Sequence, residues 1–354
     1  MELALYFLIS LLAILISCMI FSNAVEWLGA KLNLSHGITG SLLAAVGTAL
    51  PETIVPLVAI FWGINKETLI KILNGETTQS LASVNSISIG AIIGAPFMLS
   101  TVAFFLIGLS SWLYFKTGRR KSKIINMDQT VLERDLIFFL ISFSGAFIAV
   151  FLTHHIFHVL IAILMILIYL VYLYKTIKEE SNNKYKGEEL EENLDPFLLS
   201  KIFKIKPTLS MIAIQLIISL LLLIYSAHHF VEVIKEVSIK LNFPLFVTSL
   251  LLTPIATELP EKFNSWMWIR QKKDTLALGN ISGALVFQST FPITIGLLFT
   301  SWHISSFLSY FIFIICIINA SLVLIALKTK KLTYKTFLLC GIPYILYLSF
   351  VFFR

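Results

Sequence analysis

The chain has 354 residues, of which 57% are hydrophobic and only 13% are charged. Soluble globular proteins carry about 25% charged residues, so this composition excludes a soluble domain and indicates an all-α protein that crosses a membrane repeatedly. The net charge of +7 could suggest a nucleic-acid partner. Its basic residues fall between apolar segments, where they orient a chain in a bilayer, so we expect no nucleic-acid binding.

Apolar runs of about 20 residues predict ten membrane-spanning helices. The N-terminal run lacks the basic start and cleavage site of a signal peptide, so we interpret it as the first span. The third run is long for one crossing, and Pro96 could bend it. In chain order the expected spans are 2–30, 38–62, 80–114, 134–152, 155–176, 208–238, 244–269, 276–301, 304–326 and 334–353.

Basic residues between these spans gather on one side of the membrane. The opposite side receives only Lys66, Lys71, Lys235, Lys240 and Arg354. Because cytoplasmic loops carry the excess of Lys and Arg, we expect a cell (plasma) membrane protein with both termini outside.

A charged stretch at 178–206 separates the first five spans from the last five. It predicts three parts: a five-helix unit at 1–177, a cytoplasmic linker at 178–206, and a second five-helix unit at 207–354. For the linker, a solvated tether is favoured over a regulatory sensor.

The two units share a motif that is unusual inside a membrane. Gly-Thr-Ala-Leu-Pro-Glu at 47–52 corresponds to Ala-Thr-Glu-Leu-Pro-Glu at 256–261. An odd number of spans per unit inverts the second copy, and inverted repeats with broken helices at a central site are typical of transporters. The predicted fold is therefore two inverted-topology five-helix repeats with broken second and seventh helices.

Each motif concentrates oxygen ligands. Pro51 and Pro260 lack an N–H, so the carbonyls of Gly47 and Ala256 lose their helical partners. A free carbonyl, a threonine hydroxyl and a glutamate then lie within about one helical turn, and such hard donors suit Na⁺, Ca²⁺ or Mg²⁺. The alternative is a proline kink in which Lys262 pairs with one carboxylate.

Both motifs resemble the α-repeats of the sodium/calcium exchanger family, in the cation/Ca²⁺ antiporter superfamily. The resemblance rests on these two G-T-S-L-P-E-type runs and on a fainter G-N-x-x-G-type run at 279–283. It implies ten helices in two inverted halves with termini outside, antiport of inorganic cations, and no enzymatic activity. It also implies that the long helices at 2–30 and 208–238 move against the others.

The resemblance implies that Glu52 and Glu261 bind the cation and that Thr48 and Thr257 add oxygens. Departures from the family pattern fall on the third and eighth helices, where Leu99 and Gln288 replace cation-facing or acidic residues. Two interpretations stay open: Glu258 supplies the lost carboxylate, or a smaller ligand set favours Na⁺ or a proton over Ca²⁺. The expected cation site is Glu52, Glu261, Glu258, Thr48, Thr257 and Gln288.

The sequence therefore predicts Na⁺/Ca²⁺ exchange by alternating access, with no cofactor beyond the transported cations. Close carboxylates cannot all stay ionised in an empty site, so H⁺-coupled antiport of Ca²⁺ or Na⁺ is the main alternative. An intramembrane enzyme using the same carboxylates is a further one. Histidines at 154, 155 and 158 could hold a metal, and those at 228 and 229 could accept protons, although boundary positions explain both groups. The sequence leaves the oligomeric state open.

Overall fold

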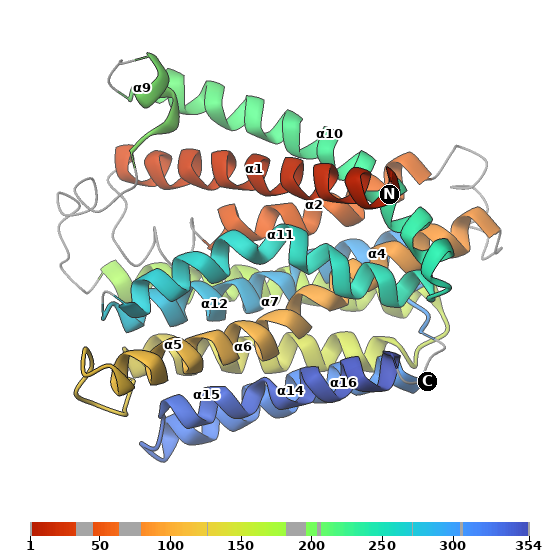
Figure 1. Cartoon of the computed structure of the whole chain (residues 1–354). Coiled ribbons are helices and arrows are strands. Elements are labelled where there is room, and N and C mark those ends of the chain that lie inside the picture. Colours follow the sequence, from red (N-terminus) through yellow and green to blue (C-terminus); the bar gives the residue numbers. More distant parts are fainter. Residues whose placement is uncertain are drawn as a thin grey trace.

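The computed structural model is a bundle of helices (Figure 1) over the residues that it describes, which are 2–32, 45–63, 79–125, 127–181, 196–203, 207–270, 272–304 and 307–352. Thr48 and Glu261 belong to helices, but their side chains lie outside this description. The chain up to Ser181 contains α1 (Glu2–Lys31), α2 (Ala45–Gly63), α4 (Gln79–Met98), the π-helix η2 (Leu99–Ala103), α5 (Phe104–Lys116), α6 (Gln129–Ala149) and α7 (His155–Ser181). The rest contains α9 (Leu198–Phe203), α10 (Leu209–Leu241), α11 (Leu245–Arg270), α12 (Asp274–Gln288), α13 (Phe291–Phe299), α14 (Phe307–Lys328), α15 (Tyr334–Cys340) and α16 (Ile342–Phe352).

Each of the ten expected spans contains helix among the described residues, and three of them contain more than one helical segment. The third continues through η2, a few residues after Pro96, and the eighth divides into α12 and α13 at 289–290. The tenth divides into α15 and α16 at Gly341. In the described part of the chain, seven helical stretches are long and apolar enough to cross a membrane, and α2 and α11 contain shorter apolar stretches.

The outer helices present apolar side chains to the surroundings. Only 22% of the most apolar part of α7 is buried, and 28% of that of α10, against 89% for Ala277–Phe299 in α12 and α13. An apolar surface of this extent indicates contact with lipid rather than water. On α7 the exposed residues include Ile156, Leu160, Ile163, Leu167 and Leu170.

The expected breaks in the second and seventh helices are absent from the described residues. α11 runs without interruption from Leu245 to Arg270, and α2 continues through Pro51 and Pro56 from Ala45 to Gly63. A proline removes one backbone donor, but its fixed φ suits a helix, and membrane helices tolerate it where neighbours satisfy the freed carbonyl. The prolines therefore leave both helices intact.

α4 and α11 cross in close contact. A methyl group added at Gly94 would lie 2.4 Å from the carbonyl oxygen of Leu250, and one at Gly90 would lie 2.6 Å from that of Phe246. The hydroxyl of Ser249 donates to the carbonyl of Ile87 across the same crossing (2.7 Å). Small residues at membrane helix crossings allow this approach of two backbones.

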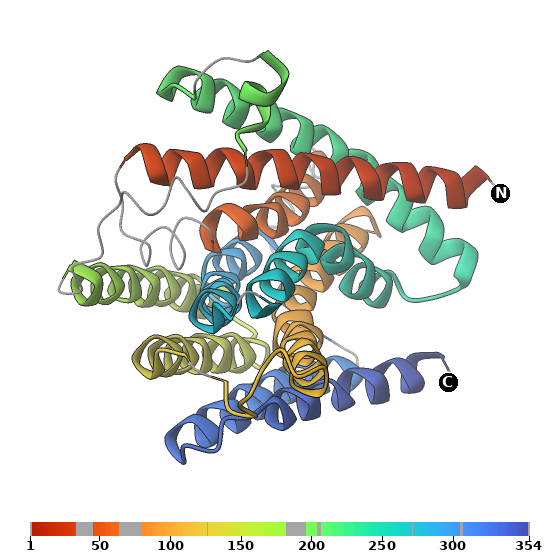
Figure 2. The same cartoon turned by 60° about the vertical axis from the view of Figure 1, so that its left-hand side comes forward.

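α1 and α10 lie side by side along one edge of the bundle (Figures 1 and 2). The short helix α9 binds to both of them. The backbone N–H groups of Leu198 and Leu199 donate to the side-chain oxygens of Asn23 on α1 (3.2 Å) and Gln215 on α10 (3.3 Å). Part of the expected 178–206 linker is thus docked on the long helices instead of being only a solvated tether.

The start of α1 and the end of α16 lie at the same end of the bundle (Figure 1). The turns from α5 to α6, from α11 to α12 and from α14 to α15 lie at the opposite end. These three turns carry many of the basic residues between helices, which are Arg119, Arg120, Lys121, Lys123, Lys272, Lys273, Lys330 and Lys331.

Candidate cation site

Four helices, α2, α4, α11 and α12, form the centre of the molecule, and each contacts the other three. They bring together the two acidic motifs and the glycine-containing run at 279–283. Polar side chains are buried on all four of these helices even though the surroundings are apolar. Those of the candidate site are Glu52, Thr257, Glu258, Asn280 and Gln288, each no more than 2% exposed.

Glu52 lies on α2 directly after Pro51. Glu52 is 2% exposed. Ionising a carboxyl group at this depth costs several kcal/mol or more unless a cation or several hydrogen-bond donors stabilise the charge. Pro56 removes the helical donor for the Glu52 carbonyl. The hydroxyl of Ser88 on α4 donates to the Pro56 carbonyl (3.4 Å), which joins α4 to this part of α2.

Glu258 on α11 forms an ion pair with Lys262, one turn further along the same helix. The Lys262 ammonium lies 2.5 Å from the Glu258 carboxylate, and both side chains are buried. We expected Lys262 as a possible partner for one carboxylate, and the structure assigns it to Glu258. Thr257 donates its hydroxyl to the carbonyl of Thr253 (3.1 Å), so its oxygen lone pairs stay available to a further partner.

α12 contributes two buried amides, Asn280 and Gln288. Among the described residues, neither the oxygen nor the nitrogen of either amide has a hydrogen-bond partner. Buried polar groups are nearly always satisfied, so four orphaned amide atoms in the packed centre require an explanation such as water or an ion. We expected Gln288 in the site but did not include Asn280, although the G-N-x-x-G-type run contained that signal.

The remaining expected residues are only partly described. Thr48 lies in α2 and Glu261 in α11, while their side chains fall outside the described residues, so their roles stay predictions. Leu99, which replaces a cation-facing family position, is fully buried in η2.

Among the described residues, the histidines at 154, 155, 158, 228 and 229 belong to no group that could hold a metal ion. His158 is buried and its Nε2 contacts the carbonyl oxygens of Ala149 (3.1 Å) and Leu152 (2.9 Å), whereas His154 and His155 are exposed. His228 lies 3.6 Å from Glu232 on the same helix. In the described part of the chain, no group of three His, Cys, Asp or Glu residues could hold a metal ion.

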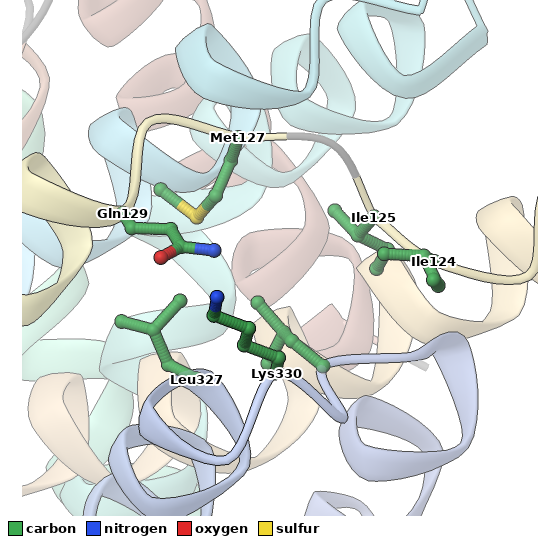
Figure 3. Close-up of a pocket in the computed structure, with 7 residues that line it drawn as sticks. Ile124, Ile125, Met127, Gln129, Leu327 and Lys330 are labelled. Carbon is green, nitrogen blue, oxygen red and sulfur yellow. The ribbon is translucent and has the colours of Figure 1, made fainter.

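A pocket of about 190 Å³ lies at the end of the bundle that carries the basic turns. Gln129 and Lys330 extend toward one another across it, and no carboxylate lines it (Figure 3). This surface pocket is therefore separate from the acidic centre and unsuited to a cation. Its other lining residues are Ile124, Ile125, Met127, Leu327 and Leu332.

A helical bundle with an apolar outer surface is typical of an integral membrane protein, and comparison with known proteins gives its class. The sequence matches the family described as sodium/calcium exchanger protein over residues 2–178 and 211–353. The chain therefore belongs to this family, within the cation/Ca²⁺ antiporter superfamily, and is a cation antiporter rather than an enzyme.

Two solved structures illustrate the similarity of fold. The chain is similar to the H⁺/Ca²⁺ exchanger CAX, with a TM-score of 0.72 and 16% identity, covering 98% of this chain and 81% of that one. It is also similar to the sodium-calcium exchanger NCX_Mj soaked with Na⁺ and Ca²⁺, with a TM-score of 0.59 and 21% identity, covering 99% and 98%. No curated protein matches the sequence.

Proposed function

We propose that this antiporter exchanges Na⁺ for Ca²⁺ by alternating access at the centre of the four-helix group. The observation that carries the proposal is the burial of Glu52 beside helices that hold the orphaned amides of Asn280 and Gln288. Carboxylate, amide and hydroxyl oxygens are the ligands that Na⁺ and Ca²⁺ prefer. The proposed ligands are Glu52, Glu261, Thr48, Thr257, Gln288 and Asn280.

H⁺-coupled antiport is the second candidate, since the similarity to the H⁺/Ca²⁺ exchanger has the higher TM-score, 0.72 against 0.59. A proton could replace a cation because neighbouring carboxylates in a low-dielectric centre favour protonation of one of them. Both candidates use the same ligands and differ in the driving ion.

We further propose that the chain forms ten spans in two inverted units, at 1–177 and 207–354, with both termini outside a plasma membrane. The arrangement of the bundle supports this orientation, because basic turns lie at the end opposite to the start of α1 and the end of α16. The alternating movement would involve α1 and α10 as one unit, since α9 links them.

Flux in proteoliposomes tests the function. We expect an outward Na⁺ gradient to drive Ca²⁺ uptake, and Glu52→Gln to reduce this uptake by about 100-fold or more, because a buried ligand charge is worth about 3 kcal/mol. Glu232→Gln is the control, as this acid is exposed on α10, and it should keep normal uptake.

Uptake driven by a pH gradient but not by Na⁺ would favour H⁺ coupling and contradict the Na⁺ proposal. Absence of uptake with either gradient would reject exchange altogether. Normal Na⁺-driven uptake in Glu52→Gln would remove this residue from the site.

A further inference from the structure

The ion pair between Glu258 and Lys262 is unusual in its depth. The side chains are 0% and 4% exposed, and their charged atoms are 2.5 Å apart. Two charges removed from water pay a large desolvation cost, and apolar residues of similar size often stabilise a fold as well or better. Stability alone therefore gives a weak reason for this pair at this position.

The pair also lies within the acidic motif itself. Glu258 follows Thr257 directly and precedes Glu261 by three residues, while Lys262 follows Glu261. The first motif has Ala49 where the second has Glu258, so one motif carries an additional carboxylate and, one turn later, an additional ammonium. The two additions cancel in charge.

We infer that Lys262 is a tethered cation that neutralises Glu258 in place of one transported monovalent ion. This inference rests on the proposed cation site. An ammonium four residues away on the same helix has a high effective concentration and needs no uptake from solution. Glu258 is then a partner of Lys262 and not a third ligand for the transported cation.

The charge balance of the motifs follows from this role. Three carboxylates, Glu52, Glu258 and Glu261, together with the Lys262 ammonium leave a net charge of −2. One Ca²⁺ or two monovalent cations would balance this charge. A protein with the same carboxylates and no lysine would need a third monovalent cation in each cycle.

The number of Na⁺ ions bound measures this role directly. A ligand that binds the folded state stabilises it with a dependence on concentration set by the number of ions bound. We would record unfolding of the purified protein against NaCl concentration at pH 8.5, with choline chloride holding ionic strength constant, for the wild type, Lys262→Gln and the double variant Glu258→Gln/Lys262→Gln.

The slope of the unfolding free energy against the logarithm of the NaCl concentration gives the number of Na⁺ ions bound to the folded protein. We expect this slope to rise by one Na⁺ in Lys262→Gln, because the freed carboxylate binds an ion from solution. The double variant should return to the wild-type slope, since it lacks both charges. The double variant keeps the test decisive if Lys262→Gln fails to fold. If its slope is one ion lower than that of the wild type, Glu258 is itself a Na⁺ ligand and the inference is overturned.

An unchanged slope in Lys262→Gln would also overturn it and leave the cation site intact. If neither NaCl nor CaCl₂ stabilises the wild type, the proposed cation site fails and the inference fails with it. The two failures are thus distinguishable.

Discussion

At the scale of single residues, Asn319 shows how one side chain supports an irregular backbone. It lies buried on α14, and its amide nitrogen donates to the carbonyls of Ser100 in η2 (2.9 Å) and Cys340 at the end of α15 (3.0 Å). A π-helical turn disturbs the regular pairing of a helix, so an external donor is needed at this depth. One amide therefore joins three segments.

Replacing Asn319 by leucine should destabilise the protein by about 1–3 kcal/mol, because two buried carbonyls lose their side-chain donor. Chemical unfolding in detergent measures this change. Ser349→Ala is the control, since Ser349 is exposed and donates to the Ile345 carbonyl of its own helix. Equal stability of the two variants would show that these carbonyls find other partners.

At the scale of elements, the crossing of α4 and α11 makes two glycines of the central helices differ, Gly90 on α4 and Gly279 on α12. A methyl group at Gly90 would lie 2.6 Å from a backbone oxygen of α11, whereas at Gly279 the nearest atom is a Val131 methyl at 4.0 Å. A backbone oxygen cannot move without displacing its helix, so only the first substitution strains the crossing.

Gly90→Ala should therefore lower stability by about 1–3 kcal/mol, as overpacking usually does. Gly279→Ala should be neutral or raise it by up to about 1 kcal/mol, because alanine has the higher helix propensity. Thermal unfolding of both variants in the same detergent compares them. A loss for Gly279→Ala as large as that for Gly90→Ala would contradict this explanation.

The elements also show what the sequence could predict. Long apolar runs indicated the long helices, because a run of that length has few alternatives to a membrane helix. The π-turn at Leu99–Ala103 and the docking of α9 on Asn23 and Gln215 were not predicted, since both depend on contacts with distant segments. Proline was given too much weight, because Pro51 and Pro260 each lie inside a continuous helix.

At the scale of the whole molecule, the paired motif predicted where a cation site would lie, and tertiary packing determines which of its described side chains are buried. The four-residue spacing already allowed Lys262 to pair with Glu258. The orphaned state of Asn280 could not be read from the sequence, because it depends on which neighbours the amide lacks. Roles for Thr48 and Glu261 stay predictions from the motif.

An ion pair between Arg120 and Asp274 joins the two halves of the chain. Arg120 follows α5 and Asp274 begins α12, and both are buried at the end of the bundle with the basic turns. A guanidinium nitrogen, Nη1, lies 2.9 Å from the carboxylate oxygen Oδ1 in a two-point contact. This geometry is typical of strong arginine–carboxylate pairs.

Asp274→Asn should therefore cost about 3–5 kcal/mol, because it leaves a buried guanidinium without its counter-charge. The double variant Arg120→Met/Asp274→Leu should recover most of this loss, since it buries no charge. Removal of the exposed pair between Lys328 and Glu133 by Glu133→Gln is the control, and it should change stability by less than about 1 kcal/mol. Thermal unfolding of the three variants provides the measurement. If Asp274→Asn costs no more than the control, the contact between Arg120 and Asp274 does not hold the two halves together.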